Sequence, residues 1–148
     1  MEHNYIKIND KLRELIDLRI NKGVQPNELM ENIANEEYLK VDAKKFFGGI
    51  QCKVEFVDYG IFDNVKSKYE YVYIYDNDMF LKEVRMVKNK IETIIWNKIY
   101  EEKKILDDII LELSNISNSS EYINKVINTL PNDLLKLIGE KYSLINNL

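Results

Sequence analysis

The side chains that could act as catalysts in this chain are few and far apart. There is one histidine, His3, near the N-terminus, and one cysteine, Cys52, in a predicted strand with no base near it in the sequence. A thiol needs a neighbouring base or positive charge to become a nucleophile, so Cys52 is expected to be a buried structural residue. One histidine and one cysteine cannot together form a His/Cys metal site within one chain. We therefore predict no metal and no cofactor.

The remaining candidates for chemistry are a glycine pair and pairs of acids. Gly48-Gly49 lacks the following Lys-Ser/Thr and helix of a phosphate-binding loop. The acid pairs Glu36-Glu37 and Asp107-Asp108 are adjacent in sequence, and neighbours on a helix point about 100° apart. They do not form an acid/base dyad by themselves. The sequence therefore predicts that the protein is not an enzyme.

Positive charge is concentrated in two segments, although the whole chain has a net charge of −4. An acidic chain is on average a poor non-specific binder of nucleic acid. Residues 40–53 nevertheless contain four lysines against one aspartate, and residues 82–104 contain seven basic residues against four acids. Lysines neutralise phosphates and release counterions. The first segment is a candidate DNA contact; the second could line phosphates or a membrane surface, or only solvate a helix.

The elements that would position these lysines are three short helices followed by two strands. Capping residues and apolar spacing predict helices from Asn9 or Asp10 to Gly23, from Pro26 to about Asn35, and from Ala43 to Phe47. Alternating polar and apolar residues predict antiparallel strands over 52–57 and 68–75, joined by a long loop. This order is typical of a winged helix-turn-helix, in which the third helix enters the major groove and the hairpin contacts the neighbouring backbone.

On that architecture the candidate DNA-binding residues are the lysines of the third helix and the hairpin, with the nearest amide that could contact a base. They are Lys40, Lys44, Lys45, Gln51, Lys53, Lys66 and Lys68. Two observations weigh against DNA binding: Asp58 and Asp63 lie in or beside the hairpin loop, and the third helix has no Arg, Asn or Gln to read a base edge. A lysine pair on a short exposed helix is also often only a solvated surface.

The longest apolar pattern runs from about Met79 to Ile116. Apolar residues recur there every three or four positions with no Gly or Pro, which predicts one long amphipathic helix. It would be longer than a globule of this chain length is wide, roughly 30 Å, so its stripe is a candidate seam between two copies. The proposed oligomerisation residues are Phe80, Val84, Val87, Ile91, Ile95, Trp96, Ile99, Leu106, Ile109 and Leu113. The alternative is an intramolecular bundle, in which two further short helices, 121–129 and one beginning at Pro131, cover the stripe.

A resemblance supports the same plan. The segment Tyr73-Ile74-Tyr75-Asp76-Asn77-Asp78-Met79-Phe80-Leu81 resembles the junction in MerR-like regulators, where a wing strand ends in an aromatic residue and an acidic cap opens the next helix. Those proteins pair through a long antiparallel coiled coil. The TubY-type accessory proteins of tubulin-like plasmid and phage partition systems have a similar plan. The resemblance implies a winged head followed by a coiled-coil arm.

These observations predict an α+β, mainly α fold in two parts. Residues 1–76 would form a winged helix-turn-helix head of three short helices plus a β-hairpin, and residues 77–148 a helical, coiled-coil oligomerisation region with a long dimerising helix and two short C-terminal helices. The predicted function is a dimeric, or higher homo-oligomeric, regulator of transcription or of plasmid or phage partition that binds double-stranded DNA. The alternative is a non-enzymatic protein-interaction module, such as a phage-type inhibitor or adaptor, that binds no nucleic acid. One cysteine and no apolar run of membrane-spanning length predict a cytoplasmic protein without a membrane span.

Overall fold

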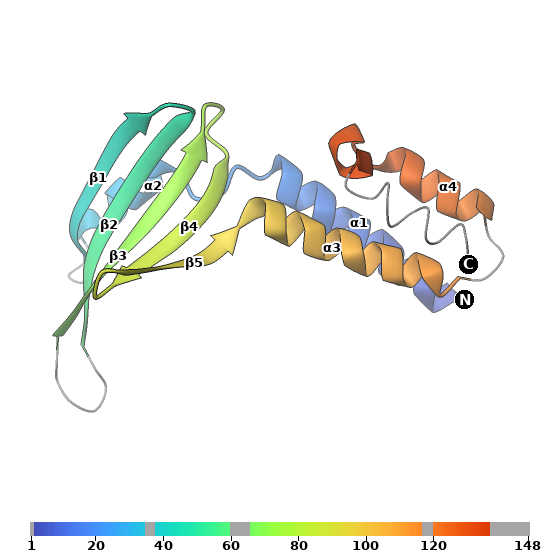
Figure 1. Cartoon of the computed structure of the whole chain (residues 1–148), viewed down its shortest axis with the longest axis horizontal. Helices are drawn as coiled ribbons and strands as arrows, with labels where there is room; N and C mark the ends of the chain where they lie inside the picture. Colours follow the sequence, from blue (N-terminus) through green and yellow to red (C-terminus); the bar gives the residue numbers. More distant parts are fainter. Residues whose placement is uncertain (1, 35–37, 60–65, 117–119, 137–148) are drawn as a thin grey trace. The chain divides into compact units, whose positions relative to one another are not determined.

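The chain forms two compact units (Figure 1). The structure, a computed structural model, describes residues 2–34, 38–59, 66–116 and 120–136. One unit comprises residues 17–102, and the other comprises residues 1–16 and 103–148. The helices α1 (Glu2–Ile20) and α3 (Lys98–Ser114) contribute residues to both. Among the described residues, no helix has the length and apolar character needed to cross a membrane.

The unit of residues 17–102 is built on a five-stranded antiparallel sheet (Figure 1). Its strands follow one another in chain order, so that β1 and β5 are the two edges. They are β1 (Tyr38–Phe46), β2 (Gly49–Tyr59), β3 (Lys66–Asp76), β4 (Leu81–Lys88) and β5 (Ile91–Asn97). A short helix, α2 (Pro26–Glu31), and a 3-10 turn, Asn32–Ala34, precede the sheet.

The two faces of this sheet differ in polarity. One face carries the core, in which Leu29 of α2 packs with buried residues of the central strands: Cys52, Val54, Tyr75, Leu81 and Val84. The Tyr75 hydroxyl donates a hydrogen bond of 2.5 Å to the carbonyl oxygen of Val24 and so ties the segment before α2 to this face. The other face presents ion pairs between adjacent strands, including Lys53–Glu70 at 3.4 Å. One face is therefore buried and the other is solvated, as expected of an antiparallel sheet.

The second unit is a bundle of helices. Its core contains residues of α1, α3, α4 (Ser120–Thr129) and the helical turn at 132–136, with one residue just after α3 and one just after α4: Ile8, Leu15, Leu106, Ile109, Leu113, Ile116, Val126, Leu130 and Leu134. Ion pairs between Lys7 and Glu112 (3.7 Å) and between Lys11 and Asp108 (3.4 Å) join α1 to α3 beside that core. The apolar residues 106, 109, 113 and 116 therefore have the spacing of a helix, but they are buried within their own chain.

The predicted winged helix-turn-helix is wrong. The two strands of the predicted hairpin are present as β2 and β3, but the third helix, expected from Ala43 to Phe47, is mostly part of β1. Of the two glycines that were expected to end this helix, Gly48 lies in the turn between β1 and β2, and Gly49 is the first residue of β2. Gly48 has a φ of +102°, and a Cβ on Gly49 would lie 1.8 Å from the carbonyl oxygen of Tyr75. That approach between β2 and β3 is open only to glycine.

The predicted single helix from Met79 to Ile116 is also wrong. Its first half is β4, a two-residue turn and β5, and only its second half is helical, as α3. Asn89 and Lys90 both have positive φ, 52° and 66°, which is the backbone of the type I′ turn that joins hairpin strands. Register shifts between Ile74 and Tyr75 and between Val84 and Arg85 break the period-two pattern of these strands. Spacings of four residues, such as that between Ile91 and Ile95, fit one face of a strand as well as one face of a helix, so they did not distinguish the two.

The segment that carries the resemblance joins two strands. The Asp76 side chain accepts hydrogen bonds of 2.9 Å from the backbone N–H groups of Asp78 and Phe80, and Met79 adopts a φ of 68°. Asp76 therefore caps the turn between β3 and β4, where the sequence predicted the cap of a helix. The predicted boundary between residues 76 and 77 falls within this turn, inside the unit of residues 17–102.

Candidate functional site

The predicted DNA-binding residues are spread over three strands. Lys40, Lys44 and Lys45 lie on β1, Gln51 and Lys53 on β2, and Lys66 and Lys68 on β3. Three of the lysines form ion pairs with carboxylates: Lys40–Asp42 at 2.9 Å, Lys53–Glu70 at 3.4 Å and Lys68–Glu55 at 3.5 Å. A phosphate would have to compete with these acids. The structure therefore does not gather the lysines on one helix, and it balances much of their charge.

The predicted oligomerisation residues divide into three groups. Leu106, Ile109 and Leu113 are in the core of the helical unit, and Val84 is in the core of the sheet unit. Phe80 lies between two ammonium groups, those of Lys22 and Lys98, at 5.2 and 4.4 Å from its ring centre. Val87 and Trp96 are partly buried, whereas Ile91, Ile95 and Ile99 are exposed. The continuous seam is absent, and what remains exposed of it lies on β5 and the first turn of α3.

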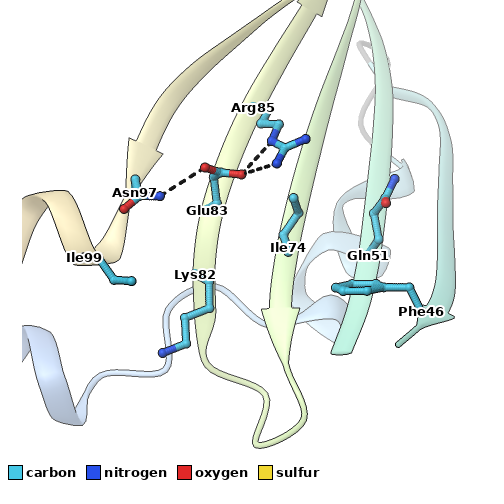
Figure 2. Close-up of a pocket in the computed structure, with 8 residues that line it drawn as sticks. All are labelled: Phe46, Gln51, Ile74, Lys82, Glu83, Arg85, Asn97 and Ile99. Carbon is cyan, nitrogen blue, oxygen red and sulfur yellow. Dashed lines mark hydrogen bonds and ion pairs between the residues drawn. The ribbon is translucent and has the colours of Figure 1, made fainter. Parts of the chain in front are cut away.

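A shallow recess of about 450 Å³ lies on the polar face of the sheet (Figure 2). Figure 2 shows Glu83 at its centre. The Glu83 carboxylate accepts a hydrogen bond of 2.6 Å from Nε of Arg85, lies 2.6 Å from Nη2 of the same guanidinium, and accepts a hydrogen bond of 3.1 Å from the side-chain amide of Asn97. Arg85 also pairs with Glu92 at 3.1 Å, and Lys82 at the rim pairs with Asp76 at 3.4 Å. Each charged side chain of the recess is thus already paired, so the recess is a weak candidate for catalysis or for capture of an ion.

The groups that the sequence analysis weighed for chemistry are not assembled into a site. The Cys52 side chain is 1% exposed, and burial raises the pKa of its thiol, which disfavours the reactive thiolate. His3 lies on α1, in the first turn of the helix. In the described part of the chain, no cluster of three His, Cys, Asp or Glu side chains could hold a metal ion.

The edge strand β5 and the start of α3 expose several large apolar side chains to solvent. Ile91, Ile94 and Ile95 are 69%, 57% and 48% exposed. Ile99 and Tyr100 continue the surface onto α3 at 55% and 63%. A groove of about 410 Å³ runs along it, lined by Ile94, Ile95, Trp96, Asn97, Tyr100 and Glu101. We call this surface, residues 91–101, the β5 edge.

The two edges of the sheet are unlike. The edge strand β1 carries Lys40, Lys44 and Lys45, of which Lys40 pairs with Asp42 on the same strand, whereas the one charged residue of β5 is Glu92, which pairs with Arg85. Exposed charges, lysines above all, are the usual protection of an edge strand against pairing with another chain. β1 has this protection and β5 lacks it. The β5 edge therefore has the chemistry of a surface that another protein covers.

Two residues of the β5 edge are not among the predicted oligomerisation residues. Ile94 was not in the predicted stripe because the helical spacing passed over it. Tyr100 lies beside the predicted stripe, where the sequence makes it a candidate interface anchor, and it is 63% exposed. The signal that could have identified β5 is its run of β-branched residues, Ile91, Thr93, Ile94 and Ile95, which favours a strand.

Comparison with known proteins provides no relative for this chain. No protein-family model, curated protein or solved structure matches it.

Proposed function

We propose that this protein is a non-enzymatic protein-interaction module that binds its partner through the β5 edge. The observation that carries the proposal is the difference in charge between the two edges: β1 carries lysines beside its exposed Leu39 and Phe46, whereas β5 carries Glu92 as its one charged residue. Five large apolar side chains within ten consecutive positions are about half exposed or more on the β5 edge.

The size of this surface supports the proposal. With side chains of roughly 200 Å² each, the five residues expose on the order of 500 Å² of apolar surface at the exposed fractions given above. Soluble monomers rarely expose a contiguous apolar patch above a few hundred Å², and those that do often use it for binding. A typical protein partner covers about 800 Å² of each chain, so the β5 edge could form the greater part of one such interface.

The chemistry of the edge indicates how a partner would bind. On an edge strand, alternate residues direct backbone N–H and C=O groups away from the sheet, where another strand can pair with them. Tyr100 and the partly buried Trp96 supply the aromatic groups that are enriched in binding surfaces. We therefore propose that the partner adds an extended segment to β5 and places an apolar side chain in the groove beside Tyr100.

A photo-crosslinking experiment tests this proposal. A photoreactive phenylalanine derivative replaces Ile94 on β5, or Leu39 on β1 as the matched control, because Leu39 is similarly exposed at 52%. The proposal expects a discrete protein adduct from position 94 in the cells that make the protein, and little from position 39. Equal labelling at both positions, or no discrete adduct at position 94, contradicts it.

Binding of double-stranded DNA stays a prediction, but the main argument for it has been removed. The argument from a winged helix-turn-helix no longer applies, and Lys44 and Lys45 are neighbours on a strand, so their side chains point to opposite faces. A cytoplasmic location is part of the present proposal, since a single buried thiol suits a reducing compartment.

A further inference from the structure

We infer that the partner of the β5 edge is a second copy of this chain, joined so that the two β5 strands pair antiparallel about a two-fold axis at Thr93. This inference rests on the proposed function and names the partner of the same site. It would join two five-stranded sheets into one continuous antiparallel sheet.

The first argument is the register that this axis produces. A two-fold axis at Thr93 sets Thr93 opposite its own equivalent and Ile91 opposite Ile95 of the second copy, the residue that the β4–β5 bulge leaves without a partner on β4. Both are favourable cross-strand pairs, apolar with apolar and hydroxyl with hydroxyl. Within one chain, Ile91 and Thr93 pair with Lys88 and Met86 of β4, while Glu92 and Ile94 pair with Val87 and Arg85. Residues directly opposite each other on adjacent strands have side chains on the same face of the sheet. In the β5–β5 register, the side chains of residues 91–94 therefore stay on the faces that they occupy in one chain.

The second argument is electrostatic. The only charged residue of β5 would lie opposite Ile94 of the second copy, so the axis does not set Glu92 against Glu92. Arg85 already pairs with that carboxylate at 3.1 Å within its own chain. The joint between the two copies therefore contains no unpaired like charges.

The third argument concerns the alternative joint, β5 of one copy on β1 of another. That arrangement would set the isoleucines of β5 beside Lys40, Lys44 and Lys45 of β1. A head-to-tail contact of this kind leaves a free edge at each end, so it adds further chains until it closes into a ring or continues as a filament. The β5–β5 joint avoids the lysines and closes after two chains.

The inference is tested by molar mass in solution. Light scattering at micromolar concentration should give twice 17.6 kDa for the unchanged protein. Ile91→Lys should raise the dissociation constant of the dimer by tenfold or more, about 1.4 kcal/mol, because each substitution sets an ammonium group against Ile95 of the other copy. Leu39→Lys makes the same change on the opposite edge and should leave the dimer intact. Circular dichroism of both variants shows whether each is folded.

A cysteine at the axis tests the register without depending on a disruptive variant. In a Cys52→Ala background, Thr93→Cys should form a covalent dimer on mild oxidation, because Cα atoms of residues opposite each other on paired strands lie roughly 4.5 or 5.5 Å apart, within the range of a disulfide. Leu39→Cys should not. A 17.6 kDa particle at all concentrations without cross-linking at position 93 overturns the inference, and so does a dimer lost by Leu39→Lys but kept by Ile91→Lys.

These outcomes separate the inference from the proposed function. If photo-crosslinking at position 94 gives an adduct with a different protein while the chain alone stays monomeric, the second-copy inference fails and the proposed function stands. If position 94 gives no discrete adduct and the chain is monomeric, both fail.

Discussion

Replacement of Ile109 by Ala tests whether the apolar stripe of α3 is sealed within one chain or between two. Ile109 is 0% exposed in the core of the helical unit, next to Leu106 and Leu113. Loss of buried methyl and methylene groups with a cavity left behind costs about 2–5 kcal/mol. We expect Ile109→Ala to lower the free energy of unfolding of the helical unit by about 3 kcal/mol. Leu111 lies on the same helix and is 60% exposed, so Leu111→Ala should cost less than about 0.5 kcal/mol.

The assay is urea denaturation followed by far-ultraviolet circular dichroism, at two protein concentrations that differ by a large factor. Both substitutions are made in the Ile91→Lys background, so that any contact through the β5 edge is removed from the comparison. For a stripe buried within the chain, the difference between Ile109→Ala and its parent is the same at both concentrations. A difference that grows with protein concentration, or an equal cost for Leu111→Ala, would refute the intramolecular packing and restore the seam between two chains.

Three further predictions follow from particular contacts. Gly49→Ala should destabilise the sheet unit by about 1–3 kcal/mol or more, measured by thermal unfolding, because its Cβ would meet the Tyr75 carbonyl oxygen; a neutral result would contradict the tight β2–β3 approach. The Cys52 thiol, buried and with a raised pKa, should react with a thiol reagent only when urea unfolds the sheet, and rapid reaction without urea would show that the core is open. Lys98 lies 4.4 Å from the Phe80 ring, and burial, with a smaller effect of Lys82, lowers its pKa below 10.5 despite Glu102 and Asp76. Between that lowered value and 10.5 the unfolded state binds more protons, so the stability of the wild type relative to Lys98→Met should rise with pH in this window. A difference in stability between the wild type and Lys98→Met that does not change with pH would contradict this prediction.

Local signals in the sequence predicted single elements better than they predicted the fold. The strands around Val54 and Tyr71 were found because their alternation is regular, and Pro26 correctly marked the start of a short helix. The apolar residues 106, 109, 113 and 116 lie in or next to α3 and are buried, as a helical stripe should be. Each of these signals needs only a few neighbouring residues.

The errors came from places where backbone conformation decides and side-chain pattern does not. The turn Asn89-Lys90 requires positive φ at both residues, and lysine there gives no warning of it, unlike an Asn-Gly pair. Ile91 and Ile95 are four residues apart, a spacing that fits one face of a strand and one face of a helix alike, and the bulge that leaves Ile95 without a partner on β4 has no signal in the sequence. The glycines at 48 and 49 predict a helix stop, whereas Gly48 turns the chain between β1 and β2 and Gly49 lies against Tyr75 of β3, which is distant in sequence.

The candidate site was predicted only in part, for the same reason. Ile91, Ile95, Trp96 and Ile99 were recognised as residues of an interface, since their apolar character does not depend on the element that carries them. Whether they lie on a helix or at the edge of a sheet depends on hydrogen bonding of β5 with β4, which no local pattern shows. Ile94 becomes a member of the site only when that pairing is known.

The difference between the two sheet edges also limits how large an assembly can become. A molecule with one edge that can pair resembles a monofunctional reagent in polymer chemistry. It forms one contact and then has no second edge available. The lysines at the far side of the sheet would leave nothing for a third molecule to join. Removal of those charges, at Lys40, Lys44 and Lys45 together, would make the chain bifunctional, and the expected product is an open-ended fibre.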